Sequence, residues 1–190
     1  MNIIQEIKQE LMTLNQKYIE ESDDNYDFWN MHIKYVVKEA VDLAKKHNAD
    51  VEIVELGALL HDIALVAKVG TKKEHHTNGV LLAKELLQRY DYPVDKQDKV
   101  LGCILNHRSS KNATNIEELC VADADIIAHF YNIPNAFVIG VKKHNFSRPE
   151  EFMNWLAGDF DDLSEETKVT FKGRYNEIMG MLFADEWENI

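Results

Sequence analysis

The chain has 190 residues, of which 45% are hydrophobic and 28% are charged, and its formal net charge is −12. These values are typical of a globular protein, and the length favours a single domain over residues 1–190. The acidic balance argues against a nucleic-acid polymer as the main partner, because binding phosphates along a polymer needs a basic surface. Two cysteines without a CxxC spacing, no signal peptide and no long apolar run lead us to expect a cytoplasmic protein with no membrane partner.

Helical periodicity dominates the sequence. Apolar residues recur at steps of three and four, and no alternating strand pattern with hairpin turns appears. The sequence therefore predicts an all-α fold of about seven to nine helices, with Asp95 and Ser164 as N-caps of two of them. The expected helices cover residues 3–18, 27–47, 51–65, 75–90, 95–107, 116–131, 136–144, 149–157 and a final segment after Ser164.

Several polar residues lie within strongly apolar helical segments. His61 and Asp62 end the segment "LGALLHDIAL", Asp123 and Asp125 lie in "CVADADII", and His32 lies near the apolar stripe of its helix. Taken singly, each is read as a core histidine bonded to a carbonyl or as a helix cap. Taken together, carboxylates in one core repel each other and are costly to desolvate, and a divalent cation resolves both problems.

These residues, in the order His32, His61-Asp62 and Asp125, resemble the H…HD…D signature of the HD-domain superfamily of metal-dependent phosphohydrolases. The similar segments run from "WNMHIKYV" through "ALLHDIA" and "EHHTNGVLLAKELL" to "CVADADII". The resemblance implies an HD-type helical bundle, with a motif core at about 28–130 and C-terminal helices at 135–188 packed on it.

The resemblance also implies that His32, His61, Asp62 and Asp125 are metal ligands. Asp125 is preferred to Asp123 because the family places its last ligand directly before an aliphatic pair. Asp123 is then expected to have a structural role or to contact the ligands without binding the metal itself. The metal is a divalent ion, with Mn, Fe, Co, Ni, Zn and Mg all open, because imidazole and carboxylate suit several of them.

Two further histidines are candidates for the same site. His75 stands four residues before Gly79, which is similar to the H-x-x-x-G opening of this helix in some branches of the family. His107 lies in "CILNHRSS", where related proteins also keep a histidine. Both are open to two interpretations. They bind a second metal, or they bind the substrate phosphate and protonate its leaving group.

Cations beside these residues are candidates for phosphate binding in an otherwise acidic chain. Lys68 follows the HD pair, and Arg108 follows His107. Positively charged side chains near a metal stabilise a bound phosphate. Lys72 and Lys73, in the same loop as Lys68, are expected to be solvated.

The predicted function is metal-dependent hydrolysis of a small phosphorylated molecule, with a nucleotide as the preferred class. Asp62, His75 and His107 are the expected catalytic residues, acting on a water that attacks phosphorus. The alternatives are a di-iron oxygenase of the HD type and a non-catalytic module that binds metal or nucleotide. In the last case Trp155, Phe160 and Trp187 would form a partner or homodimer surface rather than close the core.

Overall fold

The computed structural model describes residues 2–182, with the backbone alone at 139, 142–144 and 149, so that Trp187 and residues 183–188 of the expected C-terminal helices lie outside the described residues. The described chain is helical and contains no strand, which confirms the all-α fold class. None of its helices has an apolar stretch long enough to cross a bilayer.

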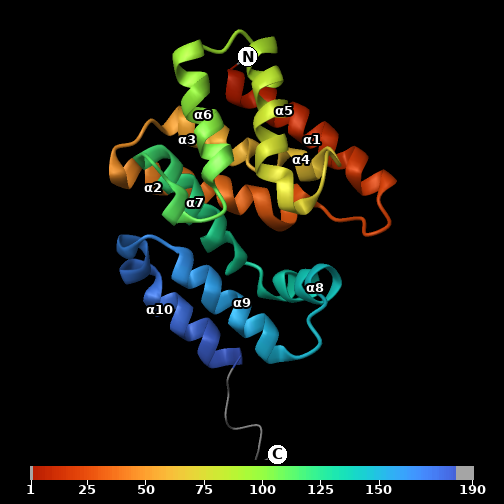
Figure 1. Ribbon diagram of the computed structural model, residues 1–190, viewed down its shortest axis with the longest axis vertical. Coiled ribbons are helices and arrows are strands. Elements are labelled where there is room, and N and C mark those ends of the chain that lie inside the picture. Colours follow the sequence, from red (N-terminus) through yellow and green to blue (C-terminus); the bar gives the residue numbers. More distant parts are fainter. Residues whose placement is uncertain (1, 183–190) are drawn as a thin grey trace, which may run out of the picture.

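The α-helices (Figure 1) are α1 (Ile3–Glu21), α2 (Lys34–His47), α3 (Val51–Leu60), α4 (Ile63–Val66), α5 (His75–Arg89), α6 (Val94–Asn106), α7 (Ile116–His129), α8 (Ile133–His144), α9 (Pro149–Asp162) and α10 (Glu165–Leu182). Shorter turns are a π-helical turn at Trp29–Ile33 and 3-10 turns at Lys72–Glu74 and Ser110–Asn112.

Helix bounds differ from the sequence prediction in several places; α9, for example, continues to Asp162 rather than ending at residue 157. The segment 51–65 divides into α3 and α4 because Asp62 leaves the helical conformation, with φ −105° and ψ 15°. Helix α6 begins at Val94, directly after Pro93, which takes the capping position and has no N–H of its own to satisfy. The prediction of Asp95 as N-cap is therefore wrong. Asp95 lies in the first turn instead, where a negative charge stabilises the positive end of the helix dipole.

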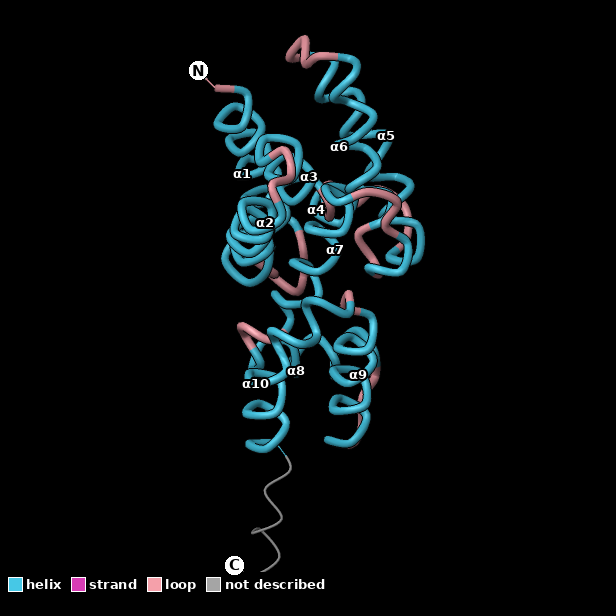
Figure 2. The backbone as a smooth tube through the Cα atoms, turned by 90° about the vertical axis from the view of Figure 1, so that its left-hand side faces the viewer, coloured by secondary structure: helices cyan, strands magenta, loops and turns pink. Residues whose placement is uncertain are grey.

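Helix α7 joins two groups of helices. Helices α1–α6 form the upper part of the molecule in Figure 1, where α2, α3 and α6 pack on α7, and α8–α10 form the lower part. Figure 2 shows α9 and α10 extending away from α7 side by side. Val121 and Ala124 of α7 belong to the larger hydrophobic cluster, whereas Ile126 and Ile127 belong to a smaller cluster with α9 and α10. Both cores therefore meet on one helix.

The buried carboxylate of Asp123 ties these two groups together. It accepts hydrogen bonds from the hydroxyls of Ser110, Ser164 and Thr167, the last two at 2.6 Å, and from the backbone N–H of Ser164 at 2.9 Å. The Ser164 hydroxyl also caps α10 as predicted, accepting from the N–H of Thr167 at 3.3 Å. Asp123 thus has a structural role, fixing the start of α10 against α7.

Replacing this carboxylate tests that role. Asp123→Ala leaves buried hydroxyls without their acceptor, and we expect it to lower the free energy of unfolding by about 3 kcal/mol. Thr167→Val removes one donor and leaves the others in place, so about 1 kcal/mol is expected. Urea unfolding of the metal-free protein measures both. An Asp123→Ala protein as stable as the wild type would contradict the structural assignment.

Candidate metal centre

The His61–Asp62 pair lies at the break between α3 and α4. His61 ends α3 and is fully buried, and Asp62 is 8% exposed. Adjacent side chains of a continuous helix point about 100° apart, which makes it difficult for both to face one point. The departure of Asp62 from helical geometry removes this difficulty, and its Oδ2 lies 3.6 Å from His61 Nε2.

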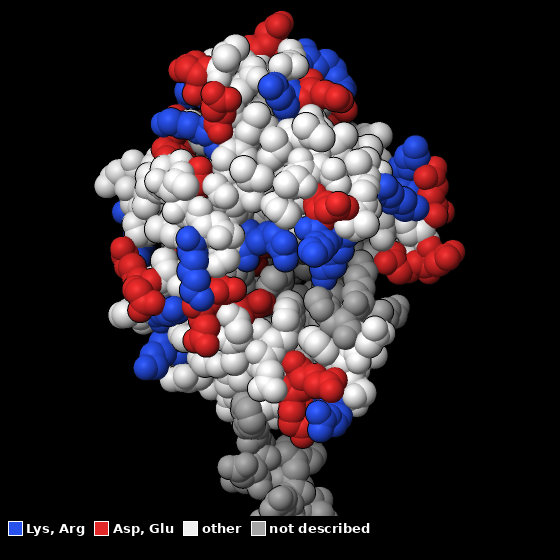
Figure 3. All heavy atoms as spheres, viewed as in Figure 1, with Lys and Arg blue, Asp and Glu red and all other residues white. Residues whose placement is uncertain are grey.

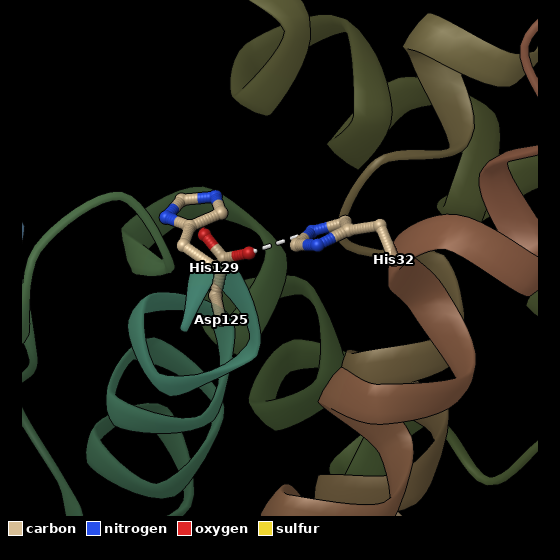
Figure 4. Close-up of side chains that lie close together, drawn as sticks. All are labelled: His32, Asp125 and His129. Atoms are coloured by element: carbon tan, nitrogen blue, oxygen red, sulfur yellow. Dashed lines mark ion pairs between the residues drawn. The ribbon is translucent and has the colours of Figure 1, made fainter. Parts of the chain in front are cut away.

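His32 and Asp125 reach the same point from other elements. His32 lies on the π-helical turn before α2, a local widening of the helix that often occurs at functional sites. Its Nε2 is 2.9 Å from Oδ1 of Asp125 on α7, as Figure 4 shows, and 3.2 Å from Nε2 of His61. His61 Nε2 is 3.5 Å from the same carboxylate oxygen. The structure therefore brings together all four predicted ligands.

A second pair of imidazoles lies on the other side of Asp62. His75 begins α5, and His107 directly follows α6. Their Nε2 atoms are 2.9 Å apart, and both lie near Oδ1 of Asp62, at 3.3 Å for His75 and 3.9 Å for His107. Gly79 helps to place His75, because a Cβ there would approach the Ile104 side chain to 3.2 Å. Glycine thus allows α5 to pack closely on α6.

Asp62 consequently belongs to two groups of side chains. Its Oδ2 faces His32 and His61, at 3.9 and 3.6 Å. Its Oδ1 faces His75 and His107. We refer to His32, His61 and Asp125 as the first group and to His75 and His107 as the second group. One carboxylate therefore presents an oxygen to each group.

Three of these imidazoles are anchored in the same way. The Nδ1 atoms of His61, His75 and His107 lie 2.7, 2.6 and 2.6 Å from the carbonyl oxygen three residues earlier in the chain. A carbonyl only accepts hydrogen bonds, so each Nδ1 carries the hydrogen. The lone pair of each neutral ring is then on Nε2. This second bond is what usually orients a metal-ligating histidine.

These hydrogen positions show that the residues fit a divalent cation. Two neutral rings that both carry hydrogen on Nδ1 bring two lone pairs together at 2.9 Å in the second group. Such an approach is repulsive unless a cation accepts both lone pairs. Imidazole nitrogens and carboxylate oxygens are ordinary donors for divalent ions.

The pKa values of both carboxylates and of His107 are shifted within the site. Burial raises the pKa of Asp125, but the hydrogen bond with His32 and the proximity of His61 outweigh it and hold the pKa well below its usual range. Burial likewise opposes the lowering of the Asp62 pKa, which comes mainly from His61 and His32. Burial lowers the pKa of His107 to about 4. Ionised carboxylates and neutral imidazole are the forms that bind metals.

His129 and Asp159, which the sequence did not single out, also belong to the surroundings of the first group. His129 lies one helical turn after Asp125, and in Figure 4 its ring stands beside that carboxylate and faces His32. Its Nδ1 is 2.8 Å from Oδ2 of Asp159. Burial lowers the pKa of His129, but Asp159 and Asp125 outweigh it and raise the pKa to about 9. His129 stands four residues after Asp125, and this spacing places both residues on the same face of a helix, so the sequence could have indicated His129. Asp159 lay beyond the expected helix end at 157.

A cavity of about 360 Å³ opens beside both groups. Its lining includes His32, Asp62, His75, His107 and Asp125, together with Tyr26, Phe28, Trp155, Asn132, Asn135, Lys72 and Arg108. In Figure 3, Lys and Arg side chains gather at the middle of the molecule, where the upper helices meet the lower ones. The cavity lining therefore combines metal-binding side chain types with aromatic, amide and cationic ones.

The structure does not bring Lys68 into this cavity. Lys68 adopts a left-handed backbone conformation, with φ +57°. Its ammonium donates to the carbonyl oxygen of Glu21 at 3.0 Å and lies over the ring of Tyr18. Lys72, expected in a solvated loop, lines the cavity instead, together with Arg108.

The segment that carries these residues matches a known family. Residues 31–129 match the HD domain family, a span of more than half the chain that contains all four ligands of the predicted signature. The chain belongs to the HD domain family. The resemblance inferred from the sequence is thereby confirmed.

Individual relatives of this HD-domain protein are distant. Ribonuclease Y of Treponema denticola is 33% identical over 97 residues, which are 51% of this chain and 18% of that protein, so the chain spans less than a fifth of this curated relative. A predicted HD superfamily hydrolase from an uncultured Thermotogales bacterium has a TM-score of 0.68 at 20% identity, covering 96% of this chain and 92% of the other. Bacillus subtilis YpgQ in complex with ADP has a TM-score of 0.61 at 21% identity, covering 94% and 97%. These structures share the fold.

Substitutions at Asp123 and Asp125 should differ in how much a bound metal stabilises the protein. A ligand that binds only the folded state at a hundred times its Kd adds about 2.7 kcal/mol of stability. We expect the HD domain with Asp123→Asn to be less stable than the wild type but to keep this gain in Mn²⁺. Asp125→Asn should lose most of the gain. Thermal unfolding with and without Mn²⁺ measures it, and a full gain in Asp125→Asn would rule out Asp125 as a ligand.

Proposed function

We propose that this HD-domain protein is a metal-dependent phosphohydrolase that acts on a small phosphorylated molecule, and that the molecule is a nucleotide. The observation that carries the proposal is the position of Asp62. Its two carboxylate oxygens face two separate groups of imidazoles beside one cavity. This arrangement suits two divalent ions that share a carboxylate.

Divalent ions bound by the two groups would lower the pKa of a coordinated water and polarise a phosphoryl oxygen. The chain's own residues supply the rest of the chemistry. Asp62 joins the two groups, and the carbonyl anchors keep His61, His75 and His107 in one tautomer. Four imidazole nitrogens favour Mn, Fe, Co, Ni or Zn over Mg, which prefers an all-oxygen site.

The lining of the cavity supports a phosphorylated substrate. Lys72 and Arg108 both line it, and a guanidinium beside a metal binds phosphate oxygens with two parallel hydrogen bonds. The volume of about 360 Å³ is that of a pocket for a small molecule. With a net charge of −12, the chain as a whole disfavours a nucleic-acid polymer.

The preference for a nucleotide has two supports. Tyr26, Phe28 and Trp155 give the cavity aromatic surfaces on which a base stacks, and Asn132 and Asn135 add amides that both donate and accept hydrogen bonds. The solved structure of Bacillus subtilis YpgQ, which shares the fold, contains ADP. We place the phosphates toward the metal groups and the base toward the aromatic residues.

The direct test is hydrolysis by the purified protein with added Mn²⁺ or Co²⁺, using nucleoside mono-, di- and triphosphates and simple phosphomonoesters. We expect release of phosphate or pyrophosphate from a nucleotide. Asp62→Ala should abolish release and metal uptake while circular dichroism shows the fold retained, because it removes the shared ligand. Full activity in this variant, or no hydrolysis of any phosphate compound by the metal-loaded wild type, would contradict the proposal.

Metal content tests the role of the second group. We expect two equivalents of metal per chain in the wild type and one in the double variant His75→Gln/His107→Gln, because the first group remains intact. His76→Gln is the matched control, since it changes the neighbouring histidine. Elemental analysis after gel filtration gives the counts. Two equivalents in the double variant would contradict a role of the second group in metal binding.

The same bridging arrangement also suits a di-iron oxygenase, which is the second candidate. Oxygen consumption by the ferrous-loaded protein without hydrolysis of phosphate compounds would favour it. A non-catalytic module is the third candidate, and tight ADP binding without turnover over a panel of metals would favour that interpretation.

A further inference from the structure

His32 is oriented differently from the other imidazoles of the centre. His61, His75 and His107 each donate from Nδ1 to a carbonyl of the preceding turn. Among the hydrogen bonds of the described residues, His32 makes none of this kind. Its ring instead stacks on that of His129, with centroids 5.4 Å apart and planes inclined by 16°.

His129 is in turn held by the C-terminal helices. Its Nδ1 donates to Oδ2 of Asp159 at 2.8 Å, and its ring contacts Trp155 at a centroid distance of 5.1 Å. Asp159 and Trp155 both belong to α9, which joins the smaller hydrophobic cluster through Phe152 and Leu156. A continuous path of contacts thus leads from the packed core of α9 to a ligand of the first group.

We propose that Asp159 is a positioning residue of the metal centre: acting through His129, it holds the His32 ring so that Nε2 is directed at Asp125 and His61. Asp159 lies outside the segment 31–129 that matches the family. The inference rests on the metal centre proposed above and is independent of phosphate chemistry.

The stacking of His32 on His129 should raise metal affinity because it restricts the rotation of the His32 ring. His32 comes from a π-helical turn near the surface, and its side chain is 11% exposed, whereas that of His61 is 0% exposed. An imidazole that turns about its side chain bonds must lose that freedom when it binds a metal. A ring already held against His129 loses less. Residues that orient a metal ligand without binding the metal typically contribute tenfold to a hundredfold in metal affinity or activity.

The test measures Co²⁺ affinity of the chelator-treated protein by visible absorption, so no substrate is needed. We expect Asp159→Ala to weaken Co²⁺ binding about tenfold. Asp159→Asn should fall in between, because the amide oxygen still accepts from His129 Nδ1. Asp162→Ala is the matched control. Asp162 lies on the same helix and pairs with Lys111 at 2.6 Å, and its loss should leave the affinity unchanged.

A double variant separates positioning from general destabilisation. If Asp159 acts through His129, then Asp159→Ala has no further effect on Co²⁺ affinity in a His129→Ala background. Thermal unfolding of the metal-free variants checks that Asp159→Ala and Asp162→Ala remain folded. Wild-type Co²⁺ affinity in Asp159→Ala, or equal weakening in both backgrounds, would overturn the inference. If the wild type bound no Co²⁺, the metal centre itself would fail and this inference with it.

Discussion

The carboxylate of Asp62, shared between two pairs of imidazoles, is the interaction on which the site depends. Around it, buried histidines present Nε2 lone pairs to one another, and a second carboxylate, Asp125, approaches from α7. Apart from the His32–Asp125 contact, these groups do not satisfy one another, because the carboxylates and the Nδ1-protonated rings of His61, His75 and His107 are all acceptors at this point. Burying acceptors against one another is costly, and cations placed between them reverse the sign of the interaction.

The fold places these groups at irregular points of otherwise regular helices. His61 and Asp62 lie at a helix break, His32 on a π-helical turn, and His75 and His107 at the start and end of their helices. The hydrophobic faces pack without interruption, and the polar groups meet where helices begin, end or change winding. Helix ends also leave carbonyls free, and two of these orient His61 and His107, whereas a carbonyl of the 3-10 turn before α5 orients His75.

The core of the site was predictable because its residues stand out from their apolar surroundings. His32, His61, Asp62 and Asp125 keep a recognisable order, and apolar periodicity placed the helices that carry them. The break at Asp62 was not predictable, since "LGALLHDIAL" has continuous helical character and tertiary contacts decide where it ends. The prediction that Lys68 binds the substrate phosphate is not supported by its position. Its backbone is left-handed and its ammonium donates to Glu21, which no local sequence pattern indicates.

The contribution of the C-terminal helices escaped prediction for a related reason. His129 and Asp159 are thirty residues apart and meet only because α9 packs beside the end of α7. A side chain pairing of that kind has no periodicity. Asp123 was expected to have a structural role, but its bonds to Ser164 and Thr167 required the tertiary structure. In this HD-domain protein the path from α9 to His32 thus extends the site beyond the family segment.

Electron paramagnetic resonance of the Mn²⁺-loaded protein tests the shared carboxylate most directly. Two ions held by the two groups and sharing Asp62 would be magnetically coupled, so the account predicts a coupled spectrum at full loading that disappears in Asp62→Ala. A spectrum of isolated Mn²⁺ at every loading would contradict it.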